Sequence, residues 1–192
     1  HADPRRAPGG TQVERLSEEQ WRHVAEGLEQ AGRICQEYGM KLVYHYHAST
    51  VVESGEEIDR LLSMTDPGLV HLLYDTGHAY YGGSDPLALL RKHARRIAYI
   101  HLKDVRGEVL KRVREEQIPF VESVRQGVFT VPGDGSIDFA PIFQELYRRG
   151  YEGWMIIEAE QDPLVAEPYA YAEKAIAYIR ELAAALPTEE AG

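Results

Sequence analysis

Four short apolar runs divide the chain, and each of them ends in polar residues. The runs cover residues 41–47, 69–74, 97–102 and 154–158. Short runs in which apolar residues predominate up to a polar end are typical of parallel strands covered on both faces. We therefore predict four strands, and we expect their carboxyl ends to gather at one edge of a sheet.

Segments with helical spacing separate the predicted strands. Before the first strand, Ser17 and Gln20 match a capping box, apolar residues follow at helical spacing, and Gly39 ends the pattern. A charged helical segment, a proline and a second short helix make up a longer insertion at residues 105–127. The remaining helices are predicted over residues 54–64, 87–96, 138–149 and 168–186.

This alternation of strands and helices predicts an α/β protein with a parallel sheet and right-handed crossovers. A complete (β/α)8 TIM barrel needs about 250 residues, whereas this chain has 192. Four βα units, which we expect to span residues 13–186, amount to half of such a barrel. Residues 1–12, which are rich in Pro and Gly, are expected to be a flexible leader, and residues 187–192 a tail.

Imidazole, ammonium and carboxylate side chains stand at the carboxyl ends of all four predicted strands. Histidine nitrogens and carboxylate oxygens are common ligands of divalent metals in proteins. Because barrel chemistry collects at the carboxyl ends of strands, their joint placement predicts a metal site there. The candidates are His45, His47, Asp75, His78, His101, Lys103, Asp104, Glu158 and Glu160.

Each candidate also has a purely structural alternative. Asp75 could instead cap a helix, and His78 could be an ordinary loop histidine. His101 could be a packed histidine that is satisfied in the core, and Lys103 could belong to a surface salt bridge. Glu158 follows four apolar residues, and such a carboxylate is costly to bury unless it is paired or bound to a metal.

Charge and cysteine content limit the classes of function. The formal net charge of −10 argues against a nucleic-acid partner, because phosphate binding needs clustered Lys and Arg. The sequence contains no apolar run of about 18 residues, so we expect no membrane-spanning segment. The one cysteine, Cys35, cannot form an internal disulfide. This favours a reducing compartment, and we expect a cytoplasmic protein.

Five segments together resemble the inosose dehydratase (myo-inosose-2 dehydratase) family, which lies within the xylose-isomerase-like barrels. The resemblance covers about residues 14–182, and its last two segments are specific, whereas Asp-Thr-Gly-His marks only the superfamily. The segments are Tyr-His-Tyr-His at 44–47, Leu-Leu-Tyr-Asp-Thr-Gly-His at 72–78, His-Leu-Lys-Asp-Val-Arg at 101–106, residues 129–139 and residues 153–163.

The resemblance implies a metal held by Glu, Asp, His and Glu from four successive strands. Asp75, His101 and Glu158 occupy the last three places. His45 stands in the first place, where relatives elsewhere in the superfamily carry the Glu of Glu-Asn-His, and His47 matches the trailing His. The implied metal is Mn²⁺ or Co²⁺. Glutathione is linked to some members, although no residue here argues for it.

The resemblance further implies a carbon–oxygen lyase of myo-inositol catabolism. It would remove water from the polyol ketone 2-keto-myo-inositol (scyllo-inosose) to give a trihydroxycyclohexane-1,2-dione. A metal would polarise the carbonyl, while protein groups would move the protons. We expect His78, Lys103 and Glu160 to transfer protons and His47 to bind substrate. The alternatives are a sugar isomerase or epimerase of the same superfamily, and a non-catalytic fragment.

The resemblance also implies that this chain is the C-terminal half of the barrel, because a full family member carries about four more βα units ahead of residue 13. Without them, the outer strands of the predicted half-barrel lack the neighbours that would close it. Because unpaired strand edges favour association, we expect this chain to form a homo-oligomer or to aggregate.

Overall fold

The computed structural model describes residues 15–187. Its strands are β1 (Leu42–His45), β2 (Val70–Asp75), β3 (Ile97–Leu102), β4 (Asp104–Val105), β5 (Phe129–Thr130) and β6 (Trp154–Ile157). Its α-helices are α1 (Glu18–Glu37), α2 (Gly55–Ser63), α3 (Thr76–Tyr81), α4 (Pro86–His93), α5 (Gly107–Glu115), α6 (Phe120–Arg125), α7 (Ala140–Arg148) and α8 (Pro168–Ala184), and a 3-10 turn, η1, covers Ala94–Arg96.

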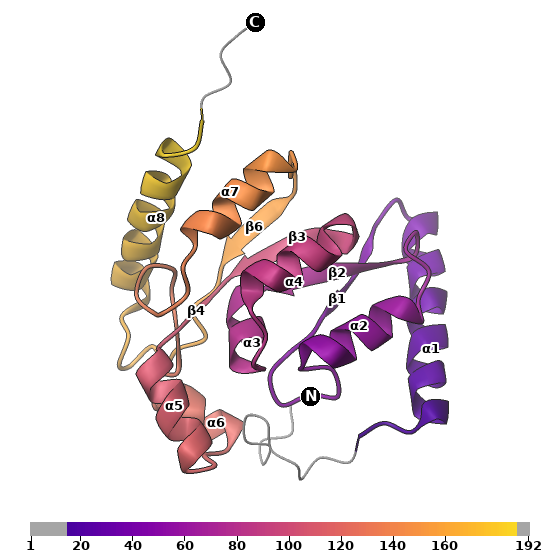
Figure 1. Cartoon of the computed structure of the whole chain (residues 1–192), viewed down its shortest axis with the longest axis horizontal. Helices are drawn as coiled ribbons and strands as arrows, with labels where there is room; N and C mark the ends of the chain where they lie inside the picture. The colour runs from indigo at the N-terminus through magenta and orange to yellow at the C-terminus, as the bar shows by residue number, and fades with distance from the viewer. Residues whose placement is uncertain (1–14, 188–192) are drawn as a thin grey trace, which may run out of the picture.

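The four predicted strands form one parallel sheet in the order β1-β2-β3-β6 (Figure 1). Each strand lies beside the next one along the chain, except that β4, β5 and the insertion intervene before β6. This is the strand order of consecutive βα units in a TIM barrel, and it confirms the predicted fold class. The expected leader at residues 1–12 and most of the expected tail lie outside the described residues.

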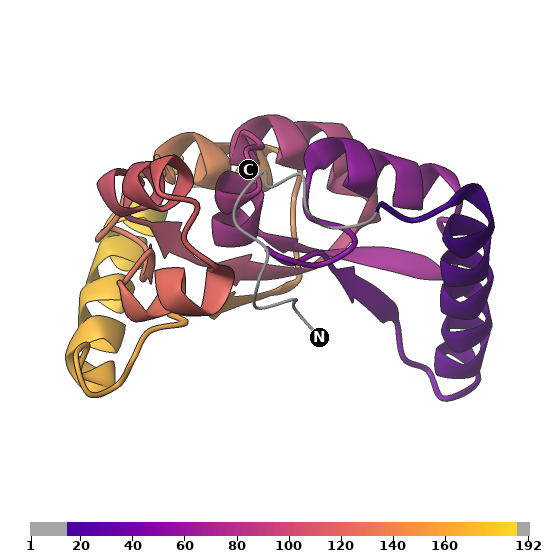
Figure 2. The same cartoon turned by 90° about the horizontal axis from the view of Figure 1, so that it is seen from below.

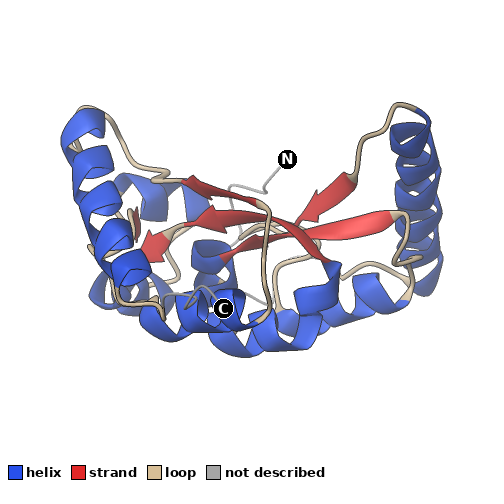
Figure 3. Ribbon diagram, turned by 90° about the horizontal axis from the view of Figure 1, so that it is seen from above, coloured by secondary structure: helices blue, strands red, loops and turns tan. Residues whose placement is uncertain are grey.

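The sheet has helices on one face and at both edges. Figures 2 and 3 show helices along one face, with α1 and α8 beside the two outer strands, while the opposite face carries no helix of residues 15–187. On β2, Val70, Leu72 and Tyr74 alternate into the fully buried layer between the sheet and the helices. Because side chains alternate along a strand, the residues between them face the opposite side, on which the described part of the chain has no helix.

Side-chain caps explain where several helices begin. Ser17 and Gln20 form the predicted capping box of α1, and Ser54 and Glu57 form a second one at α2. The structure moves several boundaries. β1 ends at His45, so that His47 lies beyond the strand, and β6 ends at Ile157, so that Glu158 also lies beyond its strand. α7 begins at Ala140 rather than at residue 138, and α8 ends at Ala184 rather than at residue 186.

Three short elements were not predicted. The helix α3 follows β2 directly, and Asp75 is its N-cap. The two-residue strands β4 and β5 pair antiparallel and tie the start of the insertion to its end. Elements this short show no periodicity in the sequence, which is why the pattern of apolar residues did not reveal them.

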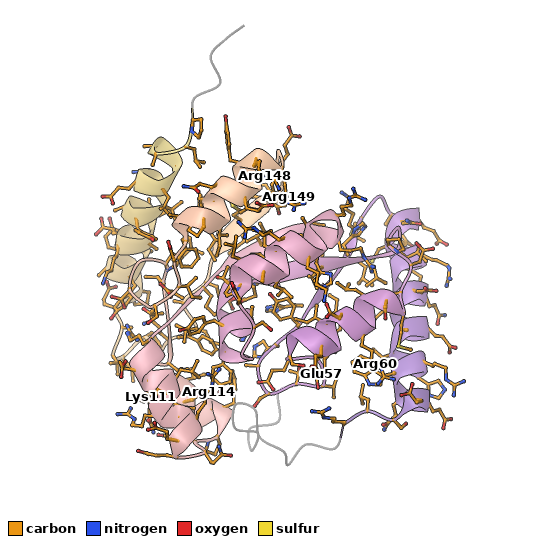
Figure 4. The ribbon with its side chains drawn as sticks, in the orientation of Figure 1. Glu57, Arg60, Lys111, Arg114, Arg148 and Arg149 are labelled. Atoms are coloured by element: carbon orange, nitrogen blue, oxygen red, sulfur yellow. The ribbon has the colours of Figure 1, made fainter. Side chains whose placement is uncertain are left out.

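The outer surface of the helix layer is strongly charged. Figure 4 shows Lys111 and Arg114 on α5 and Arg148 and Arg149 at the end of α7.

None of the helices in the described part of the chain has the length and apolar character needed to cross a bilayer.

Candidate active site

The parallel register places three candidate ligands on one face of the sheet. Asp75 of β2 pairs with His101 of β3, and His101 pairs with Ile156 of β6. Glu158 lies two residues beyond Ile156 and therefore points to the same side. Within residues 15–187, this is the side of the sheet that carries no helix.

Asp75, His101 and Glu158 each offer one ligand atom, and these atoms all lie within 4.8 Å of one another. His101 Nδ1 is 2.8 Å from Glu158 Oε2 and 3.4 Å from Asp75 Oδ2. The helix-cap alternative for Asp75 is also correct, because its Oδ1 accepts a hydrogen bond from the His78 N–H at 2.8 Å. The carboxylate therefore caps α3 with one oxygen and presents the other to the site.

Two observations show that this group fits a divalent cation. His101 Nδ1 and Glu158 Oε2 are buried, yet neither makes a hydrogen bond of good geometry with a described group. Contacts with Asp75 and then Glu158 raise the pKa of His101 to about 9. The two carboxylates therefore favour positive charge at this point, which a bound cation would supply.

His45 lies at the edge of this group. Its Nε2 is 3.3 Å from Asp75 Oδ2, and its ring centroid is 5.0 Å from that of His101. His45, Asp75 and His78 offer a second set of atoms within 4.8 Å of one another. The geometry is compatible with His45 as a ligand or as a hydrogen-bond partner of Asp75.

Lys103 is at the centre of the cluster and is fully buried. Its Nζ lies 2.8 Å from Glu160 Oε2, 3.0 Å from Glu158 Oε2 and 2.9 Å from His78 Nε2. Burial alone would lower the pKa of Lys103, but Asp75, Glu160 and Glu158 together outweigh burial and raise it. Lys103 is thus a buried ammonium group, and the surface salt-bridge alternative is wrong for it.

His78 is held in a neutral state, because burial lowers its pKa well below the usual value. The Ala48 N–H donates to His78 Nδ1 at 3.3 Å, while Lys103 Nζ faces the other ring nitrogen. A neutral imidazole has one lone pair on its ring nitrogens. In either tautomer that lone pair faces a donor of the protein, so His78 has none free for a substrate proton.

Glu160 approaches from the loop after β6. Its backbone has a φ of 45°, in the left-handed region that non-glycine residues seldom adopt and that is often found at functional sites. This conformation brings its carboxylate to Lys103 and places Oε1 3.8 Å from His47 Nε2. The structure thus gathers all eight predicted site residues from His45 to Glu160 into one cluster, whereas Asp104 faces away from it.

Asp104 holds a loop and is not part of the cluster. Its buried carboxylate accepts hydrogen bonds from four backbone N–H groups. One is from Val105, and the others are from Gly133, Gly135 and Ile137 in the loop before α7. Asp104 therefore organises a loop. The run of turn residues at 132–136 was the only sequence signal for such a contact.

Sequence reasoning also missed the walls of the cluster. The ring of Phe120, from the insertion, packs edge-on against His47 at 5.4 Å, and Phe129 packs against His78 at 5.2 Å. A Cβ on Gly77 would lie 2.6 Å from Lys103 Cγ, so the absence of a side chain makes room for the lysine stem. The glycine in Asp-Thr-Gly-His was the available signal for this close approach.

Comparisons with known proteins agree with the fold. The family model described as "Xylose isomerase-like TIM barrel" matches residues 5–182. The chain is 60% identical over 182 residues to an inosose dehydratase of Geobacillus kaustophilus, covering 95% of this chain and 59% of the relative. It is 53% identical over 166 residues to one of Clostridium beijerinckii, covering 86% and 56%. The resemblance to inosose dehydratases is confirmed, although the chain spans little more than half the length of these relatives.

Solved structures resemble the chain in fold alone. A probable 3-DHS dehydratase of Bacillus anthracis has a TM-score of 0.67 at 14% identity, over 95% of this chain and 61% of that one. The IOLI protein, solved with a zinc atom, has a TM-score of 0.61 at 21% identity, over 90% of this chain and 58% of that one.

Proposed function

Because the chain belongs to the family of xylose isomerase-like TIM barrels, we propose that its cluster is the catalytic part of a metal-dependent dehydratase. The proposed substrate is 2-keto-myo-inositol, which would lose water to give a trihydroxycyclohexane-1,2-dione. The 60% identity to a protein named inosose dehydratase carries the choice of reaction. The ammonium of Lys103, placed between carboxylates and beside the three-ligand group, supports it chemically.

Asp75, His101 and Glu158 would hold the metal, with His45 beside them. When bound there, a divalent cation supplies the positive charge that polarises a substrate carbonyl. Mn²⁺ or Co²⁺ is the proposed ion. A bound zinc atom in the IOLI structure supports the general choice of a divalent cation in a protein of this fold. No contact in the described cluster argues for glutathione.

Glu160 is the proposed base, because its carboxylate is partly exposed whereas both nitrogens of His78 face donors. Glu160 takes the proton from the carbon next to the carbonyl, and the electron pair of that C–H bond forms the new double bond. The C–O bond of the β hydroxyl breaks, and the leaving oxygen takes a proton from the Lys103 ammonium to become water. The carbon that lost its proton still carries a hydroxyl, so this product is an enol, and a shift of the enol proton to carbon gives the second carbonyl of the dione. The 2.8 Å contact between Glu160 and Lys103 lets the proton return to the lysine.

His78 and His47 complete this arrangement without reacting. His78 contacts Lys103 Nζ and thereby fixes the direction of the ammonium group. The ring of His47 packs at a tilt against that of His78, with ring centroids 3.7 Å apart, and His47 is proposed to bind a hydroxyl of the substrate. The phenylalanine rings beside the two histidines limit the access of water from the insertion side.

The test is a chimera in which this chain replaces the matching part of the Geobacillus kaustophilus relative. We expect the chimera to dehydrate 2-keto-myo-inositol with added Mn²⁺ or Co²⁺. Lys103→Met and Glu160→Gln should each lower kcat about 10²- to 10⁴-fold, which is the usual contribution of a positioned acid or base.

The matched control is Lys111→Met, because Lys111 is an exposed lysine on α5, whereas Lys103 is fully buried. A chimera that isomerises or epimerises the ketone without releasing water would contradict the proposal. A Lys103→Met variant with the full rate would exclude this lysine as the acid.

A further inference from the structure

Two side-chain hydroxyls hold the backbone of site residues at the ends of the central strands. The Tyr46 hydroxyl donates to the Asp75 carbonyl oxygen at 2.7 Å and accepts from the Asp75 N–H at 2.9 Å. The Thr76 hydroxyl does the same for Lys103, donating to its carbonyl oxygen at 2.6 Å and accepting from its N–H at 2.9 Å. A hydroxyl can serve both groups because it has one donor hydrogen and two acceptor lone pairs.

The backbone of β1 does not provide these hydrogen bonds to Asp75. The pairing of β1 with β2 ends at His45 opposite Leu73. Beyond that point the chain turns away from the sheet, and the His47 N–H donates to the Val52 carbonyl at 3.2 Å. The Tyr46 side chain therefore replaces two ladder hydrogen bonds at the position where the backbone leaves the sheet.

Tyr46 thereby determines where the carboxylate of Asp75 can lie. The backbone of Asp75 is held on both of its polar groups by Tyr46, and its Oδ1 is held by the His78 N–H. Only Oδ2 is left, and it faces His45 at 3.3 Å, His101 at 3.4 Å and the Lys103 ammonium at 3.6 Å. The phenol itself is fully buried, so water cannot take its place.

We propose that Tyr46 is a positioning residue that holds Asp75 in the place from which its Oδ2 would bind a divalent cation. This inference rests on the proposed function for the identity of the bound group. Partners behind a ligand that orient it typically change metal affinity about 10- to 100-fold when they are removed.

The chain offers a matched control in Tyr74, the residue next to Asp75. Tyr74 is also fully buried, and its hydroxyl donates to the Pro86 carbonyl oxygen at 2.8 Å. Its side chain points into the helix layer, away from the cluster. Tyr46→Phe and Tyr74→Phe each remove one buried phenol oxygen, but only the first change frees the backbone of Asp75.

The first measurement is the affinity of the 192-residue chain for Co²⁺ by isothermal titration calorimetry. We expect Tyr46→Phe to weaken Co²⁺ binding about 10- to 100-fold, Tyr74→Phe to leave it close to that of the unchanged protein, and Asp75→Ala to abolish it. Unchanged affinity in Tyr46→Phe would overturn the proposal. An equal loss in both tyrosine variants would also overturn it, because general destabilisation would then explain the result.

The second measurement needs no metal and separates this inference from the proposed function. Hydrogen exchange of residues 75–81 should become faster in Tyr46→Phe but not in Tyr74→Phe, because the start of α3 is held through Asp75. If the unchanged protein binds no Co²⁺, the proposed metal site fails and hydrogen exchange decides the role of Tyr46. Exchange that is unaltered by Tyr46→Phe then contradicts that role.

Discussion

Asp75 uses its two carboxyl oxygens for different purposes. One caps α3, and the other faces His45 and His101. The sequence left a choice between a helix cap and a ligand, but the two interpretations do not exclude each other. An aspartate that ends a strand and begins a helix has one oxygen left over for chemistry, because capping needs only one.

His45 provides a test of the metal site at the scale of one residue. We expect His45→Ala in the chimera to weaken metal retention about 10- to 100-fold, whether His45 binds the ion or orients Asp75. The measurement is the metal content after dialysis. His71→Ala is the control, because His71 is a histidine of β2 that lies outside the cluster. Equal metal content in both variants would exclude His45 from the site.

Glu145 on α7 gives a pH prediction away from the site. Its side chain is 7% exposed and contacts Arg148, Arg149 and Arg91. Arg148 and then Arg149 lower the pKa of Glu145 to about 2 from 4.5. Because the folded pKa is depressed, its contribution to stability is present above pH 4.5 and is lost as the pH falls toward 2.

We therefore expect Glu145→Gln to lower the urea midpoint of unfolding at pH 7. At pH 3 the midpoints of the variant and of the unchanged protein should lie closer together. Glu152→Gln, at an exposed carboxylate, should have little effect at either pH. If the urea midpoint of Glu145→Gln differs from that of the unchanged protein by as much at pH 3 as at pH 7, the depressed pKa of Glu145 does not contribute to stability.

At the scale of elements, the site depends on residues just past the ends of strands. The ladders of backbone hydrogen bonds end at His45, Asp75, Leu102 and Ile157. Beyond those points, side chains take over from the ladder: Tyr46 and Thr76 hold the site residues, and Asp104 holds the loop before α7. These contacts allow the backbone to turn while it keeps the functional groups in place.

Asp104 gives the prediction at this scale. Asp104→Asn replaces one of the buried acceptor oxygens with an NH2 group, which would face the backbone N–H donors of the loop. We expect a loss of about 1–3 kcal/mol in the free energy of unfolding, which is the usual cost of leaving a buried polar group unpaired. Proteolysis within residues 131–137 should also become faster.

The control is Asp138→Asn, because Asp138 is an exposed residue that accepts from the Ala140 N–H at the start of α7, and Asn and Asp cap helices about equally well. If Asp104→Asn is as stable and as resistant as this control, the four hydrogen bonds do not organise the loop.

At the scale of the whole molecule, the sheet of the described residues has two open edges. β1 and β6 each pair on one side only within residues 15–187. Trp154 on β6 is 72% exposed, and Met155 and Ile156 beside it are about two-fifths exposed. An apolar strand edge of this kind is a template for pairing with another chain.

We therefore expect the 192-residue chain on its own to self-associate and to show little dehydratase activity, since its open face excludes little water. Light scattering should show species larger than a monomer, and Trp154→Lys should reduce them by adding a charge to the edge. Leu164→Lys changes a residue that is 93% exposed in a loop, and it should have no such effect. A monomeric and fully active chain would refute this interpretation.

Local patterns in the sequence were sufficient to predict the strands, most helices and the set of residues at the strand ends. Buried parallel strands need continuous apolar runs, and helices need periodic apolar residues and caps. Both patterns can therefore be recognised from a few neighbouring residues. Because parallel strands bring their carboxyl ends together, the sequence also indicated that Asp75, His101 and Glu158 would converge.

Only the tertiary structure decided how each residue acts within that cluster. Lys103 can be buried because its ammonium contacts Glu160 and His78 and its stem packs where Gly77 has no side chain. These residues lie between 25 and 57 positions away along the chain. Tyr46 has the apolar spacing of an ordinary core residue, and its hydroxyl meets Asp75 only when β1 and β2 are aligned in register. Contacts between distant segments follow no local period, so the sequence by itself does not contain a readable signal for them.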